Sequence, residues 1–286
     1  MSVVERAPAK ANLVLHVGGP RADGLHPLRS IFASLDLWDE VAVHEADVDE
    51  VICPGVAGAN LAARALAAFR GATPGAALAP LRIEIDKRIP VAAGLGGGSA
   101  DAAAVLRAAN VLAGEPLDRA ALRTVAATIG SDVPSQVSPG HALVSGAGEV
   151  VEPCGLAELA LVLVPSERGL ATADVFAELD RLRAAGQAPP ARVDLDPRPL
   201  RELAAGPAGA LAAAAENDLE PATLSLRPEL QGVLDALVGE GALAARITGS
   251  GPTAIGLFAA RGAAEAAAGE LAGALVVGTA PAEARP

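Results

Sequence analysis

The stretch VAAGLGGGSADAAAV (91–105) joins a glycine-rich segment directly to an alanine-rich one. Ordering glycine costs roughly 0.5–1 kcal/mol more than ordering alanine, so this arrangement needs a reason. A flexible linker is one explanation, but the segment is short and lies between a predicted strand and a predicted helix. It matches neither a Walker A loop nor the Gly-x-Gly-x-x-Gly dinucleotide pattern. We therefore predict a phosphate-binding loop, because glycine lets the amides of a helix N-terminus approach anionic oxygens.

The segments on either side of this loop have the patterns of regular secondary structure. Apolar and polar residues alternate in LRIEIDKRIP (81–90), which predicts a half-buried strand. After the loop we predict a helix from about Ser99 to Ala113, with Ser99 as its N-cap. The N-terminus of such a helix carries about half a positive charge, which favours an anion there.

Strand and helix patterns continue along the rest of the chain. Before the loop we predict a strand over 11–17, two further strands with a turn near residues 38–39, and a helix over 59–69 capped by Asn60. Further elements are predicted as helices over 118–130, 172–186 (with Thr172 as a candidate cap), 207–216 and 227–240, a surface loop over 187–200, a strand over 158–165, a strand–turn–strand over 245–258, and a final helix and strand. This order indicates two α/β domains with a boundary near residues 150–160.

The composition limits the cellular setting and the class of partner. A net charge of −12 and a pI near 4.8 disfavour nucleic acid and anionic membrane surfaces as partners. No apolar run reaches the roughly 20 residues that span a bilayer, and the first residues lack the apolar core of a signal peptide. Cys53 and Cys154 are too few for a disulfide framework. We expect a cytoplasmic protein, and a small phosphorylated ligand remains compatible with its charge.

Lysine is scarce in this chain. Of 22 basic residues only Lys10 and Lys87 are lysine. The planar fork of arginine cannot replace a compact ammonium group at every site, so a lysine that persists here is a candidate for a specific role. Lys10 lies in the segment APAKANLVLHV (7–17), whereas Lys87 has no comparable motif around it. We interpret Lys87 as a surface residue at the end of a strand.

Three segments together resemble the motifs of the GHMP small-molecule kinase superfamily: residues 7–28, 89–110 and 245–258. Some members of that superfamily phosphorylate a diphosphocytidyl alcohol. This chain resembles them in three further segments, RADGLHPL, IGSDVP and ENDLEP. The resemblance covers nearly the whole chain in the same order. It implies a two-domain α/β (α+β) fold, with a ribosomal S5 domain 2-like domain over 1–155 and a ferredoxin-like domain over 156–286. The active site would lie between them.

The resemblance also implies a division of labour in phosphoryl transfer from ATP to an alcohol. The family lysine matches Lys10, which would neutralise charge on the γ-phosphate, and the family aspartate matches Asp132, which would accept or orient the hydroxyl proton. Mg²⁺ is implied with ATP, and besides Asp132 no carboxylate stands out as its ligand. Ser99 would bond a phosphate or approach the metal. The residues expected to wrap the ATP phosphates are Pro90, Val91, Ala92, Ala93, Gly94, Leu95, Gly96, Gly97, Gly98, Ser99 and Ala100.

The residues expected to bind the alcohol substrate are Asn12, His26, Thr172 and Phe176, of which Phe176 would stack on the cytosine. One position departs from the family pattern: Leu25 stands where a tyrosine is usual, in DGLH. Stacking of a base on an aromatic ring is worth about 1–3 kcal/mol, so this change leaves cytidine recognition open. The segment DVPSQV also lacks the aromatic residues usual after DVP.

Most of these candidates also have an ordinary structural explanation. Lys10 could be a surface lysine and His26 a solvent-facing loop residue. Phe176 could pack in the core, and a helix or turn cap would explain Asp132, Ser99 and Thr172. Two other functions compete with the first. One is a kinase of the same superfamily for another small alcohol, such as homoserine or mevalonate. The other is a ligand sensor without turnover. In either case we expect a small-molecule partner and a monomer or weak homodimer.

Overall fold

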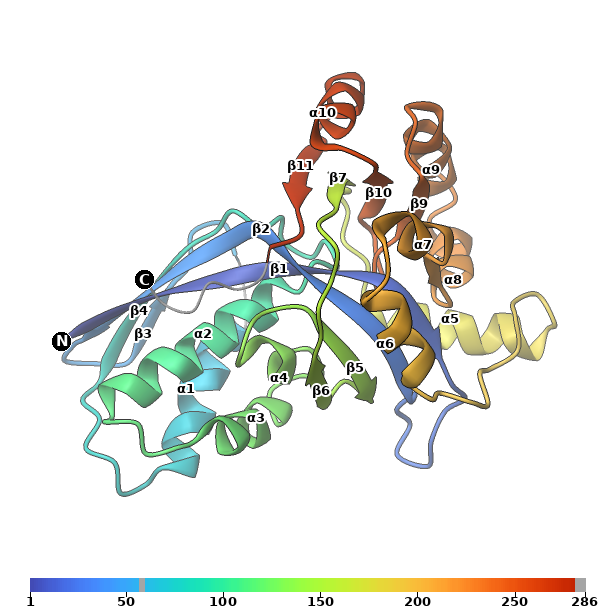
Figure 1. Ribbon diagram of the computed structural model, residues 1–286. Helices are drawn as coiled ribbons and strands as arrows, with labels where there is room; N and C mark the ends of the chain where they lie inside the picture. Colours follow the sequence, from blue (N-terminus) through green and yellow to red (C-terminus); the bar gives the residue numbers. More distant parts are fainter. Residues whose placement is uncertain (57–59, 281–286) are drawn as a thin grey trace.

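Two β-sheets organise the computed structural model, which describes residues 1–56 and 60–280 (Figure 1). In this part of the chain the larger sheet has seven strands, in the order β3-β4-β2-β1-β8, with β5 paired to β2 and β6 paired to β5. These strands are β1 (Ser2–Val17), β2 (Leu28–Glu45), β3 (Glu50–Ile52), β4 (Leu81–Asp86), β5 (Ala142–Gly146), β6 (Val150–Pro153) and β8 (Glu216–Asn217).

Four helices cover one face of the larger sheet, and they are α1 (Leu61–Ala72), α2 (Gly97–Leu112), α3 (Arg119–Ala127) and α4 (Val133–Gln136) (Figure 1). The predicted alternation is confirmed over β4, where Leu81, Ile83 and Ile85 are buried in the core beneath α1 and α2. Alanines make up most of the buried face of α2, and their small side chains let this helix lie close to the sheet. The predicted cap of α1 is also confirmed, since Asn60 Oδ1 accepts a hydrogen bond from the Ala62 amide at 2.8 Å.

The smaller sheet lies in the second half of the chain. Among the described residues its strand order is β11-β7-β10-β9, with every neighbouring pair antiparallel. Its strands are β7 (Ala160–Val164), β9 (Ala244–Ile247), β10 (Ala254–Phe258) and β11 (Leu275–Gly278), and α9 (Leu230–Gly239) and α10 (Arg261–Glu270) supply the helical side of its core. Numbered along the chain, the order is 4-1-3-2, which is the ferredoxin-like arrangement that the resemblance implies.

The two halves of the chain are joined by more than the connection at residues 154–159. The short strand β8 comes from the second half, yet it pairs in parallel with β1 through Val14 and Leu15. The remaining helices are α5 (Thr172–Ala184), α6 (Arg198–Ala204), α7 (Ala208–Ala213) and α8 (Glu220–Leu226). The division into 1–155 and 156–286 therefore places β8 apart from the sheet that it completes, and that division stays a prediction.

Two sequence-based expectations for the backbone are wrong. The turn near residues 38–39 does not exist, because β2 runs unbroken from Leu28 to Glu45 between β1 and β4. Asp39 resembles a turn residue in the sequence, but it is fully buried within this strand. The surface loop over 187–200 ends early, since α6 begins at Arg198. The hairpin of β5 and β6 and the helix α8 were not anticipated at all.

Over residues 1–56 and 60–280, no helix combines the length and the apolar character required to cross a bilayer.

Candidate active site

A cavity of about 890 Å³ lies between the glycine loop, β1, α5 and the turn at residues 249–250. Its volume falls in the range of small-molecule binding sites. The predicted site residues that line it are Lys10, Asn12, His26, Gly94, Gly96, Ser99, Asp132, Thr172 and Phe176. Within the described part of the chain, its lining does not include the predicted residues Pro90, Val91, Ala92, Ala93, Leu95, Gly97, Gly98 and Ala100. Segments from all three sequence motifs therefore meet at this cavity.

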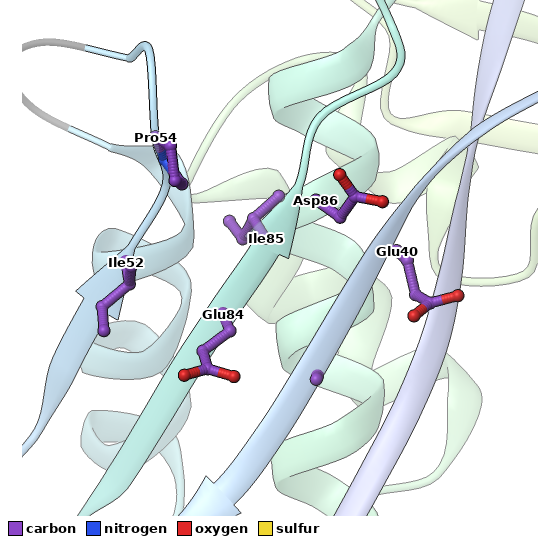
Figure 2. A pocket seen from close by; sticks show the side chains of 7 residues that line it. Glu40, Ile52, Pro54, Glu84, Ile85 and Asp86 are labelled. Atoms are coloured by element: carbon purple, nitrogen blue, oxygen red, sulfur yellow. The ribbon is translucent and has the colours of Figure 1, made fainter.

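A second, smaller hollow of about 370 Å³ lies on the strands β2, β3 and β4, and Figure 2 shows side chains that line it. Three carboxylates line it, from Glu40, Glu84 and Asp86. Their negative charge would repel a nucleotide phosphate. This hollow is therefore a poor candidate for the phosphate site.

Lys10 and Asp132 form an ion pair at the wall of the larger cavity. Lys10 Nζ lies 3.2 Å from Asp132 Oδ2 and donates a hydrogen bond to Asn12 Oδ1 at 2.6 Å. The ammonium also lies 4.7 Å from the centre of the Phe32 ring, within the range of a cation–π contact. Lys10 is 5% exposed, whereas one third of the Asp132 side chain reaches solvent. The arrangement holds a buried cation beside a carboxylate that a substrate can reach.

The position of Asp132 excludes the ordinary structural explanation for its side chain. It occupies the N-cap position of α4, but its carboxylate makes no capping hydrogen bond. It turns to Lys10 instead. A carboxylate that leaves its own helix uncapped to face a cavity is available for a reaction there.

The glycine loop begins its helix earlier than predicted. Helix α2 starts at Gly97, and its N-cap is Gly96 in the left-handed conformation, with φ of 72° and no side-chain cap. Ser99 is therefore not the cap, and lies within the first turn with its side chain at the cavity. Because no side chain caps this helix, its N-terminal amides are left for a ligand to bind.

Tight packing and a left-handed backbone explain why the loop needs glycine at two positions. Gly94 has φ of 77°, and a Cβ there would lie 2.5 Å from the carbonyl oxygen of Gly251. A Cβ on Gly96 would lie 2.9 Å from the Lys10 side chain. In addition, the Lys10 amide donates to the Leu95 carbonyl at 2.9 Å, which ties the loop to β1. The loop is thus held against the third motif on one side and the buried cation on the other.

Of the predicted substrate residues, Asn12 lies beside Lys10, where its Oδ1 accepts from the ammonium. The other three, His26, Thr172 and Phe176, also line the cavity. His26 and Phe176 have ring centres 4.9 Å apart, and His26 Nε2 lies 3.0 Å from Asp180 Oδ1. Leu25 is 53% exposed at the cavity wall. Thr172 does not cap α5, whose N-cap is Ala171, and its hydroxyl instead lies 2.9 Å from that of Ser250. The histidine and the phenylalanine therefore form a two-ring wall beside the exposed leucine.

Sequence reasoning missed Asp180 and Phe32. Asp180 follows Thr172 and Phe176 at intervals of four residues, so the helical period of α5 places all three on one face. That spacing was a usable signal for Asp180. Phe32 lies on β2, and only the pairing of β2 with β1 brings it to Lys10. No local sequence pattern predicts such a contact between strands.

Comparison with known proteins gives the family. The GHMP kinase N-terminal domain family matches residues 60–142, and the GHMP kinase C-terminal family matches residues 200–276. A 4-diphosphocytidyl-2-C-methyl-D-erythritol kinase of Anaeromyxobacter dehalogenans is 45% identical, over 94% of this chain and 84% of that protein. The chain belongs to the 4-diphosphocytidyl-2-C-methyl-D-erythritol kinase family of GHMP kinases.

Solved structures agree with the fold of this kinase family. A crystal structure titled 4-(cytidine 5'-diphospho)-2C-methyl-D-erythritol kinase is 31% identical, has a TM-score of 0.78, and aligns over 96% of this chain and 98% of that one. The homoserine kinase of Cytophaga hutchinsonii, at 20% identity and a TM-score of 0.71, covers 98% of this chain and 95% of its own length and shows the fold alone. The predicted two-domain GHMP kinase fold is thereby confirmed.

The interpretation of Lys87 as a surface residue is wrong for this member of the kinase family. Its side chain is 12% exposed and lies between two buried carboxylates, Asp39 and Asp101. Lys87 Nζ donates to both, at 2.8 Å in the case of Asp101 Oδ2. We call these three residues the Lys87 cluster. Its members are far apart in the sequence, so only the packing of β2, β4 and α2 reveals it.

The Lys87 cluster anchors the start of the glycine loop. Asp39 Oδ1 accepts hydrogen bonds from the backbone amides of Arg88 at 2.6 Å and Ile89 at 2.8 Å. These residues lead directly into the loop at Pro90. Asp101 lies in the first turns of α2, on the other side of the loop. One lysine and two carboxylates thus connect the two ends of the phosphate-binding segment.

The burial of Asp101 should make the free energy of unfolding depend on pH. Burial raises the pKa of this carboxyl from 3.8 to about 7, although the Lys87 ammonium acts in the opposite direction. Between these pH values the folded protein holds a proton that the unfolded chain has lost, so this group lowers the free energy of unfolding as pH rises from about 4 to about 7. Asn at this position cannot titrate. The unfolding free energy of Asp101→Asn minus that of the wild type should therefore increase across this window.

Urea unfolding of both proteins at several pH values measures that difference, in which titrating groups outside the Lys87 cluster cancel. Parallel stability curves would contradict the raised pKa of Asp101.

Proposed function

We propose that this chain transfers the γ-phosphoryl group of ATP to the 2-hydroxyl of 4-diphosphocytidyl-2-C-methyl-D-erythritol. The family relation supports this activity, with 45% identity over 94% of the chain to a protein of that name. The observation that carries the proposal is the ion pair of Lys10 and Asp132, at 3.2 Å, in the same cavity as the uncapped N-terminus of α2.

In the proposed reaction Asp132 accepts the proton of the attacking hydroxyl. The substrate oxygen forms a bond to the γ-phosphorus while the bond from that phosphorus to the departing ADP oxygen breaks. Phosphoryl transfer has a loose transition state, so orientation of the hydroxyl by Asp132 matters more than its strength as a base. Lys10 holds Asp132 in place and offers a further N–H to the charge on the transferred group.

The glycine loop fits a polyphosphate on structural grounds. Helix α2 offers N-terminal amides that no side chain caps, and Gly94 and Gly96, which carry no Cβ, line the cavity beside them. For Mg²⁺, no group of three or more His, Cys, Asp or Glu side chains suited to a metal ion occurs among the described residues. Mg²⁺ commonly takes one or two protein ligands together with phosphates and water, and Ser99 and Asp132 at the cavity are the residues that would hold it. When bound, it would neutralise phosphate charge.

The two-ring wall of His26 and Phe176 is proposed to receive the cytosine. Leu25 offers an apolar surface but no aromatic face, so stacking depends on the other two residues. Asp180 holds the His26 ring through contacts of 3.0 and 3.1 Å to Nε2. Leu25 stands where the family usually carries a tyrosine, so the aromatic contacts are proposed to come from Phe176 and from the His26 ring that Asp180 fixes in place.

This assignment predicts a specific effect of Asp180→Ala. Loss of the carboxylate frees the His26 ring, so KM for the diphosphocytidyl substrate should rise about tenfold, while KM for ATP should change little. Steady-state kinetics with each substrate varied in turn measures both constants. Asp174→Ala is the control, because Asp174 is an exposed acid on the same helix. An unchanged KM for the cytidyl substrate would show that the two-ring wall is not part of the binding site.

The partners proposed are small molecules, in keeping with the net charge of −12. A cytoplasmic location and a monomer or weak homodimer stay predictions. To test the function, we would measure ADP release with Mg-ATP and the diphosphocytidyl alcohol, beside homoserine and mevalonate. Turnover confined to the diphosphocytidyl alcohol supports the proposal. Turnover with another alcohol alone would leave a kinase of different specificity, and ligand binding without ADP would leave a sensor.

A further inference from the structure

A chain of buried hydrogen bonds runs behind Lys10, away from the cavity. It starts at the backbone carbonyl of Val14 on β1, which accepts from Ser30 Oγ at 2.6 Å. Ser30 Oγ in turn accepts from Asn12 Nδ2 at 2.9 Å, and Asn12 Oδ1 accepts from Lys10 Nζ at 2.6 Å. Ser30 is fully buried on β2 and is not among the cavity-lining residues. The chain therefore connects the scaffold to the proposed catalytic lysine.

The direction of every donor in this chain is fixed by chemistry. A carbonyl oxygen only accepts, so Ser30 gives its single hydroxyl proton to Val14 and must accept from Asn12. An ammonium group only donates, so the atom of Asn12 that faces Lys10 must be its oxygen. Both ends of the chain therefore demand the same orientation of the Asn12 amide. That orientation aims a partial negative charge at the ammonium.

The backbone around Asn12 is irregular and depends on such contacts. The pairing of β1 with β2 shifts register between Pro8 and Lys10, and again between Asn12 and Val14. Bulges of this kind redirect side chains and often lie beside active sites. The backbone N–H of Asn12 donates to the hydroxyl of Thr248 at 2.8 Å. Thr248 is fully buried and belongs to the third motif, so this bond fixes the segment in place. The side chains of Lys10 and Asn12 are thus presented from a short segment between two irregularities.

We propose that Ser30 is a positioning residue for phosphoryl transfer. It touches neither substrate, and it acts by holding the Asn12 amide so that Lys10 points at Asp132. This inference rests on the proposed function for its kinetic consequence, but the position of the Lys10 ammonium can be observed without any substrate. Removal of the Ser30 hydroxyl leaves Asn12 Nδ2 without its acceptor in a buried site. The same change leaves the Val14 carbonyl without its donor, so Asn12 Nδ2 can move toward that carbonyl, which draws Oδ1 away from the Lys10 ammonium and lets the ammonium leave its place.

The two lysines of this chain allow a direct spectroscopic test. With lysine labelled with ¹⁵N, the spectrum of the side-chain ammonium groups contains signals only from Lys10 and Lys87. Both are hydrogen bonded, Lys10 in a buried site and Lys87, which is 12% exposed, in a separate cluster that serves as an internal reference. In Ser30→Ala the Lys10 signal should shift or disappear, because its acceptor and its distance from the Phe32 ring change. The Lys87 signal should stay in place.

Kinetics of the same variants supplies the second measurement. Ser30→Ala should lower kcat about 10- to 100-fold, the scale of a misplaced catalytic group, with KM for ATP within about twofold of the wild type. Ser30→Thr keeps the hydroxyl and should restore both kcat and the Lys10 signal. Ser34→Ala is the control, since it removes a buried hydroxyl from the same strand outside the chain of hydrogen bonds.

Three results would overturn the inference. These are a Lys10 signal and a kcat that both stay at wild-type values in Ser30→Ala, loss of both lysine signals together, or failure of Ser30→Thr to restore either measurement. Silence of the wild type with the diphosphocytidyl alcohol would instead contradict the proposed function. The ammonium spectrum would still decide the role of Ser30 in that case.

Discussion

Asp132→Asn should lower kcat by about 10²–10⁴-fold, the usual contribution of a group that accepts a proton in the transition state. Asparagine has nearly the same shape, but it cannot accept the hydroxyl proton and carries no charge for Lys10. The ion pair at 3.2 Å is lost, so Lys10 also loses one of the contacts that hold it. KM for ATP should change little, because the phosphates are proposed to contact the glycine loop. Single-turnover and steady-state measurements with both substrates give these constants.

Asp118→Asn is the matched control for this substitution. Asp118 is the N-cap of α3, where its carboxylate accepts from the Ala121 amide at 2.8 Å, and asparagine caps a helix about as well as aspartate. It should keep wild-type kcat and stability. The role of Asp132 would be refuted if the Asp132→Asn enzyme, folded as judged by its unfolding midpoint, retained more than about a tenth of wild-type kcat.

Asp39→Ala should destabilise the fold by about 3–5 kcal/mol, the cost of breaking a buried ion pair by removing one partner. Asp39 is fully buried and accepts from the Lys87 ammonium and from two backbone amides, of Arg88 and Ile89. All three donors would lose this acceptor, and the Ile89 amide is fully enclosed. Because the two amides lead into the glycine loop, affinity for ATP should fall as well. Urea unfolding and calorimetric titration with ATP measure the two effects.

Asp86→Ala provides the comparison for Asp39. Asp86 lies nearby on β4, its side chain is 65% exposed, and it pairs with Arg88 at the surface. Such exposed pairs contribute about 0–1 kcal/mol, so this variant should resemble the wild type. If Asp39→Ala also unfolded within 1 kcal/mol of the wild type, roughly the surface value, the Lys87 cluster would not be an anchor of the loop.

Sequence reasoning was most reliable where one segment carries the whole signal. The glycine loop, the alternation of β4 and the Asn60 cap follow from spacing and residue type over a few positions. Lys10 and Asp132 were nominated by the family resemblance, and the structure places them 3.2 Å apart across more than a hundred residues of chain. Their chemical roles rest on the proposed function.

Contacts between distant segments were the main source of error. Asp39 looks like a turn residue because aspartate is common in turns, but burial beside Lys87 gives its charge a partner and lets the strand continue. Lys87 appeared to be a surface residue because neither of its two carboxylate partners is a neighbour in the sequence. Ser99 was taken as a cap because serine commonly caps helices, whereas Gly96 adopts the left-handed conformation that starts α2 two residues earlier.

The most direct test of the central claim is ³¹P nuclear magnetic resonance of the reaction of this protein with Mg-ATP and 4-diphosphocytidyl-2-C-methyl-D-erythritol. The account predicts ADP and a new phosphomonoester in equal amounts, with the diphosphate of the substrate intact and with the new signal almost absent for Asp132→Asn. A wild-type enzyme that forms no phosphomonoester from this alcohol would contradict the account. So would a product that Asp132→Asn forms at the wild-type rate.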